Sequence, residues 1–115
     1  MNKHFDKQYL NNIVIIIVNL PRATIQYSDE LQAILQQEIK EERKDIVIDL
    51  SQCDYIDSIF LGALIFYSKK FKEVSGGMKI VEPAKLPREL FTIPISLHLL
   101  EFYKSREEAI NSFTS

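Results

Sequence analysis

Three acids and a serine lie close together between residues 49 and 58, and these residue types could do several kinds of chemistry. Asp49, Asp54 and Asp57 could hold a magnesium ion or act as a general acid and base, and Ser58 could accept a phosphate. Hard cations need more oxygen ligands than this segment offers, and Asp49 falls inside a predicted strand. We therefore expect no metal site and no cofactor here.

Few other residues could support catalysis. The chain has two histidines, His4 and His98, and a single cysteine, Cys53, too few for a structural zinc site. No serine lies in a G-x-S-x-G sequence and no glycine-rich phosphate loop is present. No cation flanks Cys53 to lower the pKa of its thiol, so we interpret it as a core residue. These observations give no support for hydrolytic catalysis or for nucleotide binding through a known loop.

Ser58 has two possible roles at the start of a predicted helix. Serine is among the best N-cap residues, so it could simply begin the helix. A helix N-terminus also presents free N–H groups and a partial positive charge, so the fold would tolerate a phosphate there. Residues 59–67, IFLGALIFY, are apolar on nearly every side of the helix, more than one core-facing stripe requires. If part of this surface is exposed, a modifiable serine lies beside an apolar patch that suits a partner.

Strands and helices that alternate along the chain must position this segment. The predicted strands are 3–9, 13–18, 45–50, 78–82 and 98–103, and the predicted helices are 27–42, 58–74, 85–92 and one that begins at Ser105. Asn11-Asn12 predicts a turn, and 51–56 a loop. Residues 75–77, SGG, supply positive φ angles that end the second helix, and Ser105 with Glu108 forms a capping-box sequence.

This order predicts one α/β domain over residues 1–115, with a mixed, largely parallel sheet of about five strands and about four helices packed against it. Functional residues in such sheets tend to lie at the carboxyl ends of the strands. Ser58 follows strand 45–50, so we expect the functional surface there.

Composition excludes some classes of partner. The chain is 46% apolar and carries a net charge of −2, so no general field favours nucleic acid. Its longest aliphatic run, 13–18, is far shorter than the roughly 20 residues that a membrane-spanning helix needs. The first residues lack the features of a signal peptide. We expect a cytoplasmic protein without direct membrane insertion.

The segment DIVIDLSQCDYIDSIFLGALI, residues 45–65, resembles the STAS domain family, the fold of bacterial anti-sigma factor antagonists. Asp57-Ser58 followed by Leu61-Gly62 carries the resemblance most specifically. It extends to SDELQAILQQEI at 28–39 and to ELFTIPISLHLLEFYKSREEAI at 89–110, and so covers nearly the whole chain.

This resemblance implies a binding module, not an enzyme, and therefore no catalytic residues. In the family, the serine that matches Ser58 is phosphorylated by a partner that is both anti-sigma factor and serine kinase, and that supplies the ATP and magnesium. The unmodified antagonist captures this partner and frees the sigma factor, and a serine phosphatase restores the serine. Asp57 is expected to position Ser58. The residues expected to contact the partner are Thr24, Asp54, Tyr55, Asp57, Ser58, Ile59, Phe60, Leu61 and Gly62.

Two departures from the family keep alternatives open. Ile59 and Phe60 stand where the family usually has a small residue and glycine, and PRAT at 21–24 replaces an acidic loop. One alternative is a docking subunit that is never phosphorylated, similar to the STAS subunits of lipid-transport ATPases, with Phe60 filling a pocket of the partner. The other is an enzyme that uses Asp54, Asp57 and Ser58.

Overall fold

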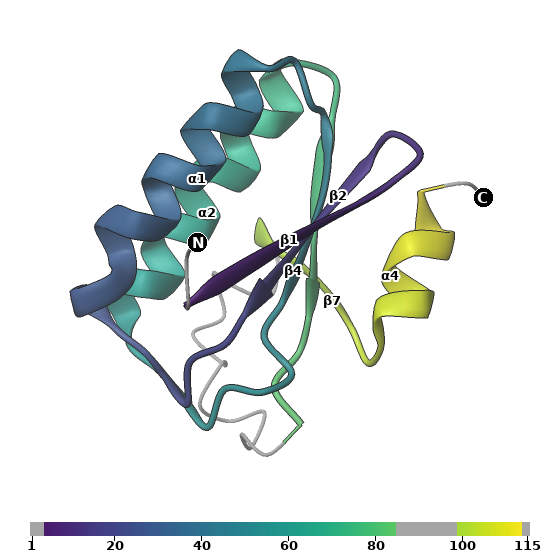
Figure 1. Cartoon of the computed structure of the whole chain (residues 1–115). Coiled ribbons are helices and arrows are strands. Elements are labelled where there is room, and N and C mark those ends of the chain that lie inside the picture. Colours follow the sequence, from purple (N-terminus) through teal and green to yellow (C-terminus); the bar gives the residue numbers. More distant parts are fainter. Residues whose placement is uncertain (1–3, 85–98, 114–115) are drawn as a thin grey trace.

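Five strands form one mixed sheet in the computed structural model, which describes residues 4–84 and 99–113 (Figure 1). Their spatial order is β1-β2-β4-β6-β7. The strands span Phe5–Leu10 (β1), Ile13–Val18 (β2), Asp45–Asp49 (β4), Gly77–Val81 (β6) and Glu101–Tyr103 (β7). β1 is antiparallel to β2, and the other neighbours are parallel. The predicted fold class, a mixed and largely parallel five-stranded sheet with helices, is confirmed.

The hairpin of β1 and β2 forms as predicted. Every residue of β2 is β-branched and buried, which suits a central strand covered on both faces. The turn places Asn11 at a φ of 55°, in the left-handed region that asparagine tolerates better than most residues. Leu10 therefore pairs with Ile13, and Phe5 with Val18.

Helices cover both faces of the sheet (Figure 1). α1 (Ser28–Lys40) and α2 (Ser58–Glu73) lie side by side on one face, and α4 (Arg106–Ser112) lies on the other. Alternate residues of β2 supply two cores: Val14, Ile16 and Val18 belong to the large core that includes α1 and α2. Ile13, Ile15 and Ile17 pack with Val47, Val81 and Ala109 in a smaller core that includes α4.

The described residues contain three of the predicted α-helices, at slightly shorter bounds. The predicted helix 85–92 and His98 lie outside the described residues, and the strand predicted at 98–103 begins only at Glu101. Ser105 caps α4 as predicted, since its hydroxyl accepts a hydrogen bond from the Glu108 N–H at 3.1 Å.

The end of α2 differs in detail from the expectation. The positive φ falls on Ser75, at 63°, and on neither glycine. Gly76 is needed for a different reason, because a Cβ there would lie 2.1 Å from the Lys44 carbonyl oxygen. The close approach of two backbones, not a left-handed turn, therefore explains this glycine.

Two short strands are absent from the prediction. β3 (Arg22–Ala23) pairs in parallel with β5 (Tyr55–Ile56); no element was predicted at 22–23, and 51–56 was predicted to be a loop. Two-residue strands are too short to show hydrophobic periodicity, which explains the omission. A 3₁₀ turn, η1 (Ile25–Tyr27), follows β3 and leads into α1. This pairing ties the connection before α1 to the connection before α2.

No helix in the described ranges is both long enough and apolar enough to cross a membrane.

Candidate functional site

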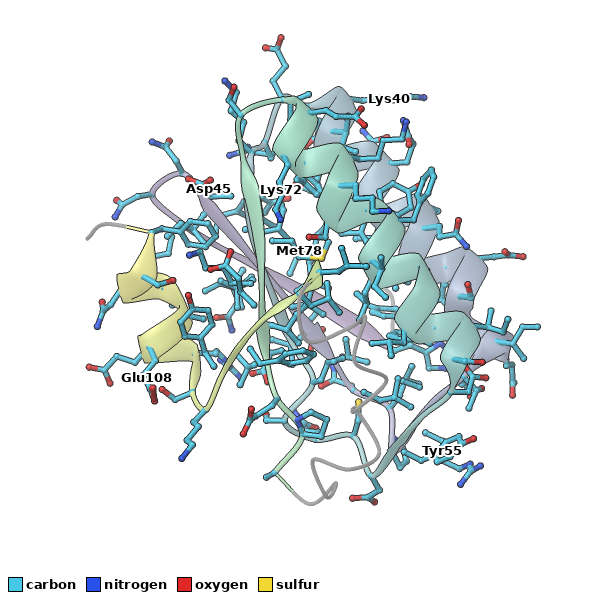
Figure 2. All side chains as sticks on the ribbon, turned by 180° about the vertical axis from the view of Figure 1, so that it is seen from behind. Lys40, Asp45, Tyr55, Lys72, Met78 and Glu108 are labelled. Carbon is cyan, nitrogen blue, oxygen red and sulfur yellow. The ribbon has the colours of Figure 1, made fainter. Side chains whose placement is uncertain are left out.

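Ser58 is the first residue of α2 and is exposed to solvent. It lies beyond the carboxyl ends of the parallel strands, as the fold class predicts. Figure 2 shows Tyr55 near the start of α2, at the end of the molecule opposite Lys40 and Lys72. The candidate site therefore occupies one end of the sheet.

The N-cap of α2 is Asp57, not Ser58. Asp57 has an extended backbone, with φ −88° and ψ 170°, and its Oδ1 accepts a hydrogen bond from the Phe60 N–H at 2.8 Å. A carboxylate at this position also complements the partial positive charge of the helix N-terminus. The possibility that Ser58 caps the helix is therefore wrong, and its hydroxyl is left out of the capping arrangement.

The second oxygen of Asp57 reaches a different part of the chain. Oδ2 accepts a hydrogen bond from the Ile25 N–H at 2.7 Å. One carboxylate thus holds the first turn of α2 and the 3₁₀ turn before α1 together. This contact supports the expectation that Asp57 positions the surroundings of Ser58.

Backbone hydrogen bonds between the two connections add to this contact. The N–H groups of Asp54 and Tyr55 donate to the Pro21 carbonyl at 2.7 and 3.2 Å, and the Asp57 N–H donates to the Ala23 carbonyl at 3.0 Å. Thr24, half-buried between Ala23 and Ile25, is therefore brought beside the Asp57-Ser58 segment. Residues expected to share one surface lie together, although Thr24 and Asp54 come from distant parts of the sequence.

Exposed apolar residues surround Ser58, and we call Ile25, Tyr55, Ser58 and Ile59 the serine face. The exposed fractions of the three apolar residues are 63% for Ile25, 39% for Tyr55 and 49% for Ile59. The Arg22 guanidinium lies 4.3 Å from the centre of the Tyr55 ring, a cation–π arrangement that steadies the ring. The serine face thus combines the exposed Ser58 hydroxyl with three exposed apolar side chains.

Sequence reasoning missed Ile25 and misplaced two other residues. Ile25 is a single apolar residue in a polar connection, and its position becomes visible only through the hydrogen bond to Asp57. Phe60 and Leu61 were expected at the partner surface, but their exposed fractions are 0% and 6%. Both belong to the large core, because Phe60, Leu64 and Phe71 share the side of α2 that faces the sheet.

The orientation of α2 places the two bulky residues after Ser58, Ile59 and Phe60, in different surroundings. The ring of Phe60 points into the core, so it cannot fill a pocket of a partner in this structure. Of this pair, only Ile59 is exposed beside the serine, and Gly62, one turn further, is also exposed. The surface near Ser58 is therefore more open than the sequence indicates.

The three acids near Ser58 serve separate purposes. Asp49 is 2% exposed, accepts a hydrogen bond from the Ser51 N–H at 2.9 Å and forms an ion pair with Arg106. Asp57 binds backbone N–H groups, while Asp54 is exposed. Across residues 4–84 and 99–113, no three His, Cys, Asp or Glu side chains are grouped as a metal site requires.

The surroundings of Cys53 and His4 indicate structural roles for both residues. Cys53 is buried, and burial, together with the negative charges of Asp49 and Asp54, raises the pKa of its thiol to about 12. A thiol with this pKa is almost entirely protonated at neutral pH and is a poor nucleophile. His4 lies 3.0 Å from Glu30, measured from Nδ1 to Oε1, and its ring meets the edge of Tyr27.

Comparison with known proteins agrees with this arrangement. The sequence profile of the STAS domain matches residues 4–109. BtrV of Bordetella bronchiseptica, a candidate anti-sigma factor antagonist, is 29% identical over 86 residues, which cover 75% of this chain and 74% of BtrV.

Solved structures show the same fold. A candidate anti-sigma factor antagonist from Thermotoga maritima has a TM-score of 0.84 at 17% identity, over 98% of this chain and 97% of its own. The Bacillus anti-sigma factor antagonist SpoIIAA matches in its phosphorylated form with a TM-score of 0.72 at 16% identity, over 95% and 98% of the two chains. The unphosphorylated form of SpoIIAA has a TM-score of 0.76 at 15% identity, over 96% of this chain and 98% of its own.

Sequence profile, relative and fold agree on one assignment. The chain belongs to the STAS domain family, and the relatives it resembles are described as anti-sigma factor antagonists.

Proposed function

We propose that this chain captures an anti-sigma factor with serine kinase activity through the serine face and thereby releases a sigma factor. The observation that carries the proposal is the placement of Ser58: it is exposed, takes no part in capping and is surrounded by exposed Ile25, Tyr55 and Ile59. Apolar surface of this kind provides binding energy when a partner covers it.

Phosphorylation of Ser58 is proposed to switch the binding off. A phosphate adds about −1.5 to −2 charges at neutral pH, and it would join the carboxylate of Asp57 in a region that also exposes Ile25, Tyr55 and Ile59. Burying this charge against a partner carries a large desolvation cost unless the partner supplies matching cations. The fold itself tolerates the charge, because the free N–H groups at the start of α2 favour anions. A serine phosphatase would restore the binding state.

The relatives support both states. Structures of SpoIIAA in unphosphorylated and phosphorylated forms resemble this chain over nearly its full length. The proposal describes a binding protein rather than an enzyme, in agreement with the protonated Cys53 thiol and the separate engagement of the acids. It also places the protein in the cytoplasm, where its proposed partner would control transcription.

The test measures binding of a purified anti-sigma factor from the same organism by calorimetry. We expect Ser58→Ala to bind as well as the unchanged chain and Ser58→Asp to bind at least about tenfold more weakly, which corresponds to about 1.4 kcal/mol. Ser75→Asp is the matched control, because it adds the same charge at an exposed serine at the other end of α2.

Kinase assays complete the test. Incubation with the anti-sigma factor, ATP and magnesium should place phosphate on the unchanged chain and on Ser75→Asp but not on Ser58→Ala. Equal binding by every variant, without incorporation of phosphate, would contradict the proposal and favour a docking subunit that is never phosphorylated. Turnover of a substrate by the isolated chain that is lost in Ser58→Ala would favour the enzyme alternative.

A further inference from the structure

The exposed side of α2 continues beyond the serine face along most of the helix. Ile59, Gly62, Phe66, Lys69 and Lys70 are all exposed, and their spacing places them on one side of the helix. With a rise of 1.5 Å per residue, this stripe runs about 16 Å from Ile59 to Lys70. We call these five residues the α2 stripe. It is continuous with the serine face through Ile59.

The glycine in this stripe has no function in the fold. A Cβ built at Gly62 would meet no atom within 4 Å outside its own helix surroundings, and no glycine here has a positive φ. Gly76 shows the contrasting case, where a Cβ would collide with the Lys44 carbonyl. A glycine inside a helix is less stable than alanine, so folding alone would favour alanine at this position. The remaining advantage of glycine is that it lets another backbone approach closely.

Phe66 and Lys70 lie further along α2 than Gly62, on the same side of the helix. Phe66 is 52% exposed, and the Lys70 Nζ lies 5.3 Å from the centre of its ring. The ring also meets the edge of the Tyr67 ring, with the centroids 5.2 Å apart. Phe66 is thus an exposed aromatic residue in an ordered position, a residue type that often anchors an interface. Exposed backbone at Gly62 thus lies between two exposed apolar side chains, Ile59 and Phe66.

The charges at the end of the stripe indicate which partner chemistry fits. Lys69 and Lys70 are exposed and lie one turn beyond Phe66, and Lys72 nearby in the sequence is also exposed. A single acid, Glu73, follows in this last turn of α2. A partner segment with an apolar residue followed by an acidic one would match this order of surfaces.

We propose that one segment of the anti-sigma factor binds to the α2 stripe. Its backbone passes over Gly62, between Ile59 and Phe66, and one of its acidic side chains faces Lys69 and Lys70. This inference rests on the proposed function and adds a second contact region, which the phosphate on Ser58 does not touch directly. Phe66 and Gly62 then determine which anti-sigma factor fits, while Ser58 determines when it binds.

The experiment compares binding of the purified anti-sigma factor by calorimetry with thermal unfolding of each variant alone. Gly62→Ala should raise Tm by about 4 °C, since a helical glycine is removed, yet weaken binding about tenfold. Phe66→Gln should weaken binding to a similar extent with Tm nearly unchanged. Val74→Gln, which changes another exposed apolar residue just after α2, should bind as the unchanged chain does. Lys70→Glu should weaken binding most at low salt.

The outcomes separate this inference from the proposed function. If Gly62→Ala and Phe66→Gln bind normally while Ser58→Asp does not, the inference is overturned and the proposed function stands. If the unchanged chain fails to bind an anti-sigma factor, both are overturned. If the chain alone sediments as a dimer and either variant makes it a monomer, the stripe binds a second copy instead, which also overturns the inference.

Discussion

Asp57 is the residue on which the geometry around Ser58 depends. Its two carboxylate oxygens accept hydrogen bonds from the N–H groups of Phe60 and Ile25, which come from different elements. A neutral alanine could accept neither bond, whereas asparagine could still cap the helix with its side-chain oxygen. The charge and the cap of Asp57 can therefore be studied separately.

At this scale we predict a contrast between neighbouring substitutions. Asp57→Ala should lower the free energy of unfolding by about 1–2 kcal/mol, because the helix loses its N-cap and Ile25 loses its acceptor. Ser58→Ala should change it by less than about 0.5 kcal/mol, since an exposed side chain outside the cap is replaced. Urea unfolding followed by circular dichroism measures both. A larger loss for Ser58→Ala than for Asp57→Ala would contradict the assignment of the cap.

The sequence identifies Ser58 and its neighbours but not their orientation. Asp54, Tyr55, Asp57, Ser58 and Ile59 were predicted to share a surface, and the structure brings them together at the start of α2. A helix that is apolar on nearly every side does not reveal which side faces the sheet, so Phe60 and Leu61 were placed on the wrong side. Ile25 was missed because its neighbourhood depends on a contact between distant segments.

At the scale of elements, long and periodic segments were predicted well and short ones were not. The strands β2, β4 and β6 and the helices α1 and α2 lie within a few residues of their predicted bounds. β3 and β5 contain two residues each, and only their pairing with each other makes them strands. This information is absent from either segment alone, which is why neither was predicted to be a strand.

A buried ion pair joins β1 to α1. The Lys7 Nζ lies 2.8 Å from Glu38 Oε2, and the Glu38 side chain is 0% exposed. Among residues 4–84 and 99–113, Glu38 Oε1 has no hydrogen-bond partner, so Lys7 is the main compensation for this carboxylate. The hydrogen bond that Lys7 donates to Glu38, and the negative charge of Glu38, raise the pKa of Lys7 above its ordinary value of 10.5 despite the opposing effect of burial.

We predict that Lys7→Met lowers the free energy of unfolding by about 2 kcal/mol, because it leaves a buried charge uncompensated. The loss should be smaller than for a fully buried pair, since the Lys7 side chain is 34% exposed. Lys7→Met with Glu38→Leu is the matched control and should recover most of the loss. Urea unfolding at neutral pH measures all three chains, and no recovery in the double variant would contradict this account.

The pH dependence of this pair has a definite sign. A raised Lys7 pKa means that the folded state holds the proton more tightly, so the contribution is complete below pH 10.5 and is lost as pH rises through the folded pKa. The difference in the free energy of unfolding between the unchanged chain and Lys7→Met should therefore become smaller in alkaline solution above about pH 10.5.

At the scale of the whole molecule, the sheet separates two cores of unequal size. The larger one supports α2 and the serine face, while α4 covers the smaller one. Arg106 holds the start of α4 to Asp49, which is 3% exposed in its side chain. α4 has only seven residues, so its own helical stability is small and it depends on these contacts.

We predict that Arg106→Met lowers the free energy of unfolding by about 2 kcal/mol, since the buried carboxylate of Asp49 then keeps, among the described residues, one backbone donor, the Ser51 N–H. Lys104→Met is the control, because Lys104 is exposed just before α4. Light scattering should also increase for Arg106→Met if α4 loosens and uncovers Ile13, Ile15 and Ile17. Unchanged unfolding would show that the ion pair contributes little.

The turn between β1 and β2 lies at the opposite end of the sheet from Ser58, since Ile13 pairs with the start of β4 and Ser58 follows its end (Figure 1). A surface tether, a fluorescent tag or an inserted domain attached at Asn12 would therefore point away from the serine face. The end of the sheet with this turn is therefore suited to attachment, and the opposite end to binding. The protein can be immobilised or built into a larger polypeptide at the turn while the serine face stays open to its partner.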